Sequence, residues 1–425
     1  MRKVFMLFAV LGLVATTAGA TQITFWFAGG DPKTDLPLVK QYIGEFEAAT
    51  GIKVKFVAIP WAEDPHTKIQ VAIASGKAPD LIKLGSPFEH VLARFGVLEP
   101  LDNLIPDEVV EAFIPAVLED SRYQATTPKG LKGKLISIPY FTDVRTILYR
   151  KDIFAERGVP EPLDWTWDDF VKYAQQLTFD RDGDGQIDVY GFGTSARYAS
   201  QWITWVWQAG GKILDENGYP VVNLPEFIEG IRFYWDLFNT YKVVPPGAIT
   251  GHLWDVGRKL LAEGKVAMYV DCGDSAKVLY EELGDKLGVG LLPKHPVTGK
   301  RTAFSGADSF VIPKQSRHKE EAAKLLLWLI DKKRMVEYCK VAGFLPARAD
   351  AAADPAFAND PIKAMYIKQL ADSRGWIKHP EASFIARTLR AEIQDALSGK
   401  KTVEEALNKA QEAILAYLKE KGYIR

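Results

Sequence analysis

One acidic loop has the residue types and spacing that could bind a calcium ion. Segment 180–188 carries carboxylates at its positions 1, 3, 5 and 9 and a glycine at position 6, as at the start of an EF-hand loop. Position 12 is Gly191, so the bidentate glutamate is missing. The loop is either a structural calcium site, because four carboxylates without a cation repel one another, or a tight Asp/Gly turn closed by bonds from side chain to backbone. The candidate ligands are Asp180, Asp182, Asp184 and Asp188. We expect that the chain requires no other cofactor.

Aromatic side chains form the second candidate for chemistry. They make up 12% of the chain and include 11 tryptophans. The densest cluster contains Trp202, Trp205 and Trp207, and on a helix the first two share one face. Indole rings stack on the flat C–H faces of sugars, but they also fill cores between helix and sheet. We expect at least one ring of the cluster in the core and one facing a ligand, with Trp254 and Trp376 as further stacking candidates.

Catalytic motifs are missing from the sequence. It contains no Gly-x-Ser-x-Gly, no His-Glu-x-x-His and no phosphate-binding loop, and no stretch marks the paired carboxylates of a glycoside hydrolase. The formal net charge is −1, which gives no support for binding to nucleic acid or to an anionic membrane. These residues thus mark no catalytic site, and a binding protein and a secreted carbohydrate-active enzyme both stay open at this point.

Residues 1–20 predict a secretory signal peptide. Arg2 and Lys3 precede an apolar run, and the segment ends in Ala18-Gly19-Ala20, which favours cleavage. We expect an exported, periplasmic or extracytoplasmic protein. In that compartment Cys272 and Cys339 could pair or stay free, because their spacing indicates neither a metal site nor a redox motif.

The elements that must position these residues alternate between strand and helix. Strands at 22–27, 52–56 and 81–84 are separated by helices at 38–49 and 67–75. This order predicts an α/β fold with a mostly parallel sheet. Ligands of such sheets bind beyond the carboxyl ends of the strands. Further strands are expected at 136–139 and 146–149, and further helices at 167–177, 322–330, 384–397 and 403–418.

Several short motifs occur in one order along nearly the whole chain. They are Ile23-Thr24-Phe25-Trp26, then 46–54 (FEAATGIKV), 75–80 (SGKAPD), 138–140 with 148–154, 165–170 (WTWDDF), 263–268 (EGKVAM) and 343–348 (GFLPAR). Together they resemble the extracellular solute-binding proteins of ABC sugar importers, the family of maltose-binding proteins.

The resemblance implies two α/β lobes of a periplasmic-binding-protein fold, each with a mostly parallel sheet flanked by helices. The first lobe would be 21–141 plus 304–338 and the second 142–303 plus 339–425. The chain would cross between them near 140–145, 302–305 and 335–344. A monomer of this kind closes its hinge around a ligand and presents the closed form to membrane permease subunits. The expected ligand is a neutral mono- or disaccharide or a cyclic polyol, and a non-sugar solute is the alternative on the same scaffold.

The family positions supply both stacking and hydrogen-bonding groups. Asp274 stands where many relatives carry an aromatic residue, which predicts a more polar pocket. Asp143, Asp274 and Asp308 either bind ligand hydroxyls or pair with Arg145 and Arg348. Few cationic residues fall at these positions, which argues against acidic sugars. The full set of expected ligand contacts is Trp26, Gly30, Asp31, Ser86, Glu89, Tyr140, Asp143, Trp202, Trp205, Trp254, Asp274, Gly306, Asp308, Arg348 and Trp376.

Overall fold

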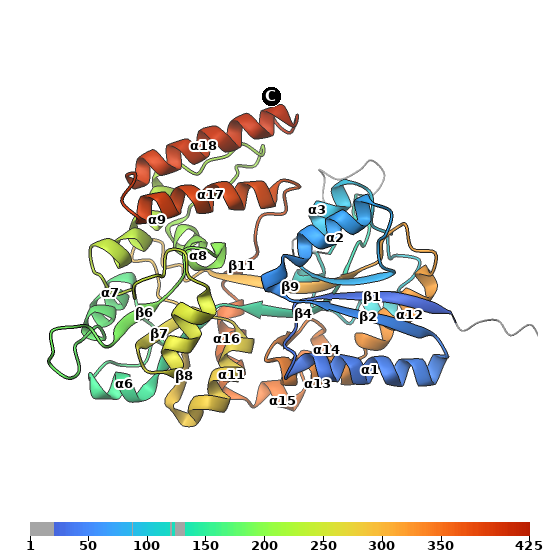
Figure 1. The fold of residues 1–425 in the computed structure, drawn as a ribbon, viewed down its shortest axis with the longest axis horizontal. Coiled ribbons are helices and arrows are strands. Elements are labelled where there is room, and N and C mark those ends of the chain that lie inside the picture. Colours follow the sequence, from blue (N-terminus) through green and yellow to red (C-terminus); the bar gives the residue numbers. More distant parts are fainter. Residues whose placement is uncertain (1–20, 87, 120, 124–131) are drawn as a thin grey trace, which may run out of the picture.

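The structure is a computed structural model that describes residues 21–86, 88–119, 121–123 and 132–425. The predicted signal peptide at 1–20 lies outside the described residues. Two sheets form the centres of two lobes, which lie side by side in Figure 1. One sheet has seven strands in the order β10-β4-β9-β3-β1-β2, with β11 joined to β9, and the other has four in the order β6-β7-β5-β8. The two-lobed α/β arrangement is as predicted.

The first lobe begins with the predicted alternation of strands and helices. β1 (Gln22–Ala28) pairs in parallel with β2 (Lys53–Ile59) and with β3 (Leu81–Gly85). The connecting helices are α1 (Asp35–Thr50) and α2 (Pro65–Ala74). They cover opposite faces of the sheet (Figure 1). Parallel strands need a crossover connection, so each helix returns the chain to the end of the sheet at which the strands begin.

The remaining strands make the first sheet mixed, so the prediction of mostly parallel sheets is wrong. β9 (Ala303–Val311) lies between β3 and β4 (Ile138–Val144) and is antiparallel to both. β10 (Leu345–Pro346) is antiparallel to β4, whereas β11 (Ser373–Arg374) is parallel to β9. The reason is that β9 enters this sheet from the second lobe, and so runs against its neighbours.

The second sheet is also mixed. β5 (Thr146–Arg150) is antiparallel to both β7 (Val266–Asp271) and β8 (Leu287–Gly290), and β6 (Tyr190–Gly193) is parallel to β7. The flanking helices include α7 (Trp167–Gln176), α8 (Ala199–Ala209), α9 (Pro225–Asn239) and α11 (Gly273–Leu283). A capping box of Thr166 and Asp169 begins α7.

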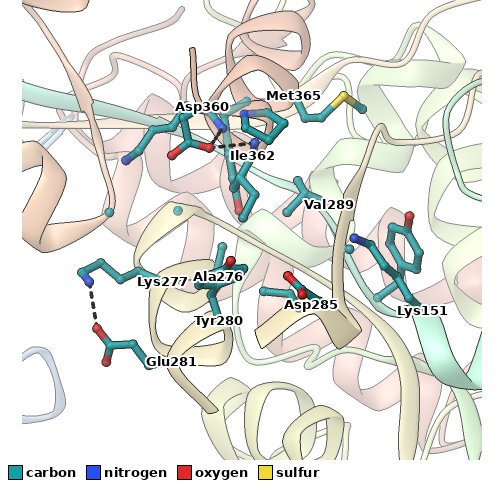
Figure 2. Close-up of a pocket in the computed structure, with 18 of the residues that line it drawn as sticks. Lys151, Ala276, Lys277, Tyr280, Glu281, Asp285, Val289, Asp360, Ile362 and Met365 are labelled. Carbon is teal, nitrogen blue, oxygen red and sulfur yellow. Dashed lines mark hydrogen bonds and ion pairs between the residues drawn. The ribbon is translucent and has the colours of Figure 1, made fainter. Parts of the chain in front are cut away.

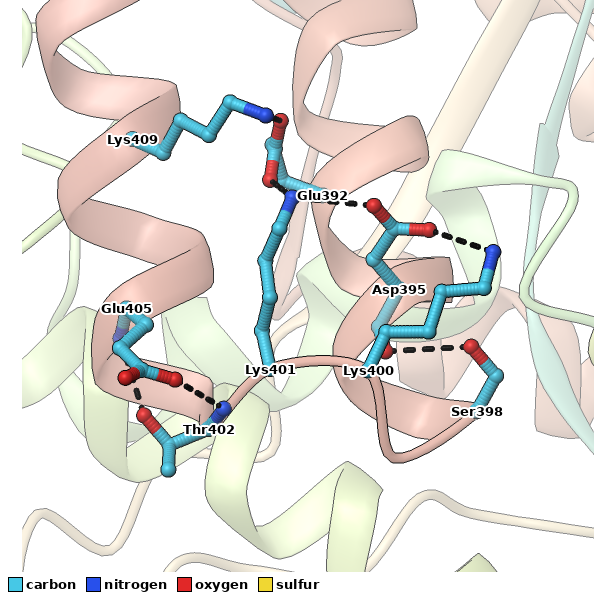
Figure 3. A network of polar contacts seen from close by, with 8 residues as sticks. All are labelled: Glu392, Asp395, Ser398, Lys400, Lys401, Thr402, Glu405 and Lys409. Atoms are coloured by element: carbon cyan, nitrogen blue, oxygen red, sulfur yellow. Dashed lines mark hydrogen bonds and ion pairs between the residues drawn. The ribbon is translucent and has the colours of Figure 1, made fainter.

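Two antiparallel helices end the chain on the second lobe. α17 (Ala382–Leu397) and α18 (Val403–Glu420) pack against each other and against α9. Figure 3 shows how their connection is fixed: the Lys401 ammonium pairs with Glu392 and, at 2.9 Å, with Asp395, and Thr402 with Glu405 forms the predicted capping box. The ammonium of Lys401, in the connection, is thus held by two carboxylates of α17, which fixes the connection against that helix.

The chain crosses between the lobes at three places. Arg145 joins β4 to β5, and β9 leads back to the first sheet. The third crossing follows α13 (Lys332–Ala342), which packs on α1 and on α12 (Lys319–Leu329). Strand β10 pairs with β4, so residues 345–346 belong to the first sheet, although we assigned 339–425 to the second lobe. The other lobe boundaries stay a prediction.

Several short helices and one longer helix complete the described structure. α16 (Pro361–Leu370) packs against β4, β5 and β8, so it lies between the lobes. Residues Trp254–Lys259 form a turn of π-helix. The other helices of the described residues are Trp61–Glu63, α3 (Phe88–Arg94), α4 (Asp107–Val110), α5 (Pro115–Glu119), α6 (Lys151–Glu156), α10 (Leu260–Ala262), Gly284–Lys286, α14 (Ala349–Ala352) and α15 (Pro355–Ala358).

Cys272 and Cys339 are both buried and free, so the disulfide that the compartment would permit is not formed. Among the described residues, none of the helices combines the length and the apolar character that crossing a membrane requires.

Candidate functional site

A cleft between the lobes consists of two adjoining cavities of about 290 and 850 Å³. Ser86 and Trp376 line both. The first lobe supplies residues from the ends of its strands and from two helix starts, the second lobe supplies residues from α8, α17 and the β11 segment, and the crossings supply the wall between them. The wall residues that the argument below uses are His66, Ser86, Phe88, Thr142, Arg145, Tyr198, Phe304, Gly306, Arg374 and Trp376.

A buried ion pair lies beneath this cleft at the end of β3. Register pairs Gly85 of β3 with Asp308 of β9, and the Asp308 carboxylate contacts the ammonium of Lys83. Lys83 is 2% exposed, donates to the carbonyl of Ala28 at 2.9 Å and lies 4.5 Å from the ring centre of Phe27. Burial raises the pKa of Asp308 to about 6, although Lys83 opposes that shift. The pair is therefore a partly desolvated polar group at the cleft floor.

A second ion pair forms part of the first crossing. The Arg145 guanidinium contacts the Asp143 carboxylate at 2.5 Å, and the same carboxylate accepts a hydrogen bond from the backbone of Gly306 at 2.8 Å. The guanidinium lies 4.9 Å from the ring centre of Phe304. The pairing alternative for Asp143 is thus the arrangement observed. Because Arg145 lines the cleft, it presents a compensated charge rather than a free cation.

Behind this pair lies a buried acidic group at the end of β7. Asp271 accepts hydrogen bonds from Tyr269 and, at 2.6 Å, from Ser275, and Cys272 donates to Asp274 at 3.0 Å. Burial and the neighbouring Asp271 raise the pKa of Asp274 to about 6. Asp274 accepts a further hydrogen bond from the Ser275 backbone and does not line either cleft cavity. Its predicted role as a ligand contact is not supported by this geometry.

Some predicted residues do meet at the cleft. Ser86, Gly306 and Trp376 line it, and Asp143 and Asp308 lie next to its wall. The Ser86 hydroxyl donates to the carboxylate of Glu89 at 2.7 Å, and Glu89 is buried. These residues come from four separate strands or helix starts, and the folding of the sheet brings them together. Their contact with a ligand stays a prediction.

Two tryptophans of the α8 cluster lie in the core instead of the cleft. Trp202 has no exposed surface and packs edge-on against Trp376 at 6.0 Å, so it supports a cleft residue from behind. Trp205 packs among Phe170, Phe192 and Phe233. Since the helix is buried on all sides, neither indole can stack on a ligand in this conformation.

The predicted positions after β1 lie outside the cleft cavities. Trp26 packs against a hydrophobic cluster of the first lobe that includes Ile82, Leu84 and Leu92. Gly30 has a positive φ of 87°, and a Cβ there would lie 2.5 Å from Leu36, so its glycine has a structural reason. Asp31 is exposed and accepts from the backbone of Lys33 at 2.7 Å in a local turn. Trp26 is thus part of strand β1, and Gly30 and Asp31 shape the connection to α1.

Three further predicted contacts have structural roles. Tyr140 is fully buried and stacks on Tyr338 at 4.3 Å. Arg348 forms a two-point pair with Asp350, at 2.9 and 2.8 Å. Trp254 is 42% exposed and lines a separate cavity of about 520 Å³. The ring of His252 contacts both Trp254 and the cleft residue Tyr198, and so connects Trp254 to the cleft wall.

Sequence reasoning missed most residues of the cleft wall, and four of them matter for the argument below. They are His66, Tyr198, Phe304 and Arg374. A signal for His66 was available, because β2 is a parallel strand of the same sheet and its carboxyl end leads into Trp61 and His66. The rule that ligands bind beyond such ends applies to β2 as well as to β1 and β3. For the other three the sequence offers no comparable signal.

The acidic loop is closed by bonds from side chain to backbone. The Asp180 carboxylate accepts from the backbone of Gly183 and Gly185, both at 2.7 Å, and these bonds lower its pKa. Asp188 accepts from the backbone of Arg181 at 2.7 Å. Carboxylate oxygens of Asp180, Asp182 and Asp188 nevertheless lie within 4.8 Å of one another. The turn is thus present, and calcium binding by the loop stays a prediction.

Another cavity, of about 670 Å³, opens beside α11, β8 and α16 (Figure 2). Its charged side chains are largely engaged with one another or with backbone: Lys277 pairs with Glu281 at 2.8 Å, and Asp360 caps α16. None of the predicted ligand contacts lines it. Close to it the lobes touch through backbone, since a Cβ on Gly273 would lie 1.9 Å from the carbonyl oxygen of Gly343.

Comparison with known proteins confirms the resemblance. Residues 41–365 match the bacterial extracellular solute-binding protein family. The chain is 27% identical over 423 residues to the arabinooligosaccharide-binding protein of Halalkalibacterium halodurans, covering 95% of this chain and 91% of that one. It is 23% identical over 366 residues, 81% of each chain, to the mannitol-binding protein of Pseudomonas aeruginosa.

A solved structure shows the same fold. The solute-binding protein of an ABC transporter from Thermotoga lettingae, bound with α-D-tagatose, superposes with a TM-score of 0.81 at 24% identity, covering 94% of this chain and 100% of that one. The matched family consists of extracellular binding proteins and not of enzymes. The match over most of the chain, the shared two-lobed fold and the cleft between the lobes show that this chain belongs to the family of bacterial extracellular solute-binding proteins.

Proposed function

We propose that this protein binds a neutral carbohydrate, a mono- or disaccharide or a cyclic polyol, outside the cytoplasm and delivers it to the permease of an ABC importer. The observation that carries the proposal is the cleft itself, in which Trp376, Tyr198 and Phe304 stand beside hydroxyl, imidazole and paired charged groups. Aromatic faces match the C–H faces of a sugar, and fixed polar groups match its hydroxyls. The names of two relatives, which bind arabino-oligosaccharides and mannitol, support this ligand class.

Charge compensation at the cleft favours a neutral ligand. Arg145 already pairs with Asp143, and Lys83 with Asp308, so these two cations need no anionic ligand. Arg374 contacts the Trp207 ring at 5.4 Å and has no carboxylate partner among the residues the structure describes. An acidic sugar, which this residue could favour, is therefore a necessary comparison in any binding screen.

A stabilisation screen tests the proposal. The purified protein without residues 1–20 is heated alone and with glucose, mannose, xylose, maltose, trehalose, myo-inositol, mannitol and glucuronate. We expect saturable stabilisation by at least one neutral compound, because a ligand bound only to the native state raises the unfolding temperature. Chromatography of the same mixtures should show no product. Product formation would instead support a carbohydrate-active enzyme, and a lack of stabilisation by every one of these compounds would support a non-sugar solute.

We further propose that residues 1–20 direct export and are then removed. The supporting pattern is the basic start, the apolar run and the Ala-Gly-Ala end. Mass spectrometry of the protein secreted by a bacterial host should give a mature chain that begins at Thr21. An intact Met1 in the exported protein would contradict cleavage.

A further inference from the structure

The imidazole of His66 has a nitrogen that the fold leaves unused. Its Nε2 atom is buried and has no hydrogen-bond partner among the described residues. The ring is held on both sides, stacked on Phe88 at 4.1 Å and in edge contact with Trp61 at 5.6 Å. A buried polar atom without a partner is destabilising. A ring that is held in place at this cost, in the wall of the cleft, is suited to a polar group that arrives with a ligand.

The His66 side chain is neutral at physiological pH. Burial lowers its pKa to about 4, and Lys83 adds to this shift while Asp64 opposes it. A neutral imidazole has one nitrogen that donates and one that accepts. Nε2 can therefore act as a donor or an acceptor toward an uncharged hydroxyl group, without adding a charge to the cleft.

The glycine at the end of β3 lets three side chains approach its Cα closely beside this nitrogen. A Cβ on Gly85 would lie 3.8 Å from His66 Nε2, 3.3 Å from Asp308 Oδ1 and 3.0 Å from the ring of Trp61. Gly85 lies in an extended strand and does not have a positive φ, so any L residue could adopt its backbone conformation. The absence of a side chain thus permits this close approach and is not required for the backbone conformation.

Three different chemical groups meet above the Cα of Gly85. Asp308 offers a carboxylate oxygen whose charge Lys83 compensates, His66 offers a neutral ring nitrogen, and Trp61, which is 42% exposed, offers an apolar ring edge. A hydroxyl group matches this set, because it can donate to the carboxylate and accept from the imidazole while its carbon contacts the indole.

We propose that the cleft wall at His66 is the subsite for one hydroxyl group of the ligand, bound by His66 Nε2 and Asp308 Oδ1 above Gly85, and that it selects the configuration of the sugar or polyol at that carbon. This inference rests on the proposed function. A site built to hydrogen-bond a hydroxyl rejects analogues that lack it far more strongly than an apolar pocket rejects a missing methylene. His66 and Gly85 therefore determine specificity, and neither was part of the expected site.

Two variants and one control test the subsite. His66→Phe keeps an aromatic ring of similar size but removes the nitrogen, and Gly85→Ala places a methyl group against the Trp61 ring and Asp308 Oδ1. Gly44→Ala is the matched control, since Gly44 is exposed on α1 and a Cβ there meets nothing within 4 Å. The probes are the neutral compounds of the stabilisation screen that bind the wild type, and the monodeoxy and epimeric forms of each. Affinities are measured by titration calorimetry, and thermal unfolding verifies that each variant folds.

We expect His66→Phe to weaken binding of the intact probe about 5- to 50-fold, and to leave unchanged the affinity for the one deoxy analogue that lacks the selected hydroxyl. Gly85→Ala should weaken binding at least as much, and Gly44→Ala should bind within twofold of the wild type. Where Gly85→Ala does not fold, His66→Phe alone decides.

Wild-type affinity in His66→Phe, or an equal loss for every deoxy analogue, would overturn the subsite while the proposed function stands. If the wild type itself binds none of the compounds, the proposed function fails and the subsite fails with it.

Discussion

Removing the negative partner of the buried Lys83–Asp308 pair should destabilise the fold as well as the site. Asp308→Asn removes the negative charge beside the ammonium of Lys83, which is 2% exposed and also donates to the Ala28 carbonyl. Breaking a buried pair by removing one partner costs about 3–5 kcal/mol. Because lysine can release its proton when buried, and because burial already disfavours the charged form of Asp308, we expect a loss below this range, about 1 kcal/mol, and a fall in Tm of roughly 2 °C.

A double-mutant cycle isolates the pair. Urea unfolding is measured at pH 7 for Asp308→Asn, Lys83→Met and the double variant. We expect the double variant to be more stable than the sum of the single losses predicts, by about 2 kcal/mol, because it leaves no unpaired charge in the lobe. The control is Asp164→Asn, since Asp164 forms an ion pair at 2.6 Å with Lys294 but is 73% exposed. That variant should lose less than about 1 kcal/mol.

The pH dependence of the same variants adds a second check. The pKa of Asp308 is about 6 in the folded protein and near 3.8 when unfolded, so the folded chain binds more protons between these values. This group therefore lowers the free energy of unfolding as pH rises from about 4 to 6, and Asp308→Asn should remove that decline. A loss below about 0.5 kcal/mol at pH 7, or single losses that simply add, would refute the reasoning about the buried pair.

Four further changes have defined outcomes. Trp376→Ala should weaken binding of any cleft ligand about tenfold or more, measured by calorimetry, because the ring lines both cavities; unchanged affinity would move the site elsewhere. Burial lowers the pKa of His379 to about 4, so the unfolded chain binds more protons between about 4 and 6.5 and stability rises with pH there. His379→Phe should remove that rise in urea midpoints taken at pH 4.5 and 6.5, and an unchanged slope would contradict it. Calcium at millimolar concentration should raise the Tm of the wild type but not of Asp180→Asn, whereas an equal response to magnesium would indicate screening only. Gly273→Ala should lower the Tm by several degrees, because its Cβ would lie 1.9 Å from the Gly343 carbonyl oxygen; a Tm equal to that of Gly44→Ala would show that the lobes adjust freely.

Local rules predicted the elements better than their pairing. The strand at Gln22–Ala28, the capped helix at Trp167–Gln176 and the capping box before Val403 all follow from short-range patterns. The antiparallel course of β9 between β3 and β4 does not, because it depends on a strand that returns from the other lobe after more than a hundred residues. No pattern within the nine residues of β9 itself specifies such a distant partner.

The tryptophans show the same limit at the level of the site. Helical spacing correctly places Trp202 and Trp205 near one face of α8, but spacing cannot state whether that face meets solvent or another layer. The answer depends on α9, which covers α8, and on the segment around residues 373–377, which brings Trp376 into edge contact with Trp202. One indole thus supports the other, and only the outer one lines the cleft. Which of two tryptophans, 174 positions apart, lies outermost is decided by long-range packing, so the site could be predicted as a region at the strand ends but not residue by residue.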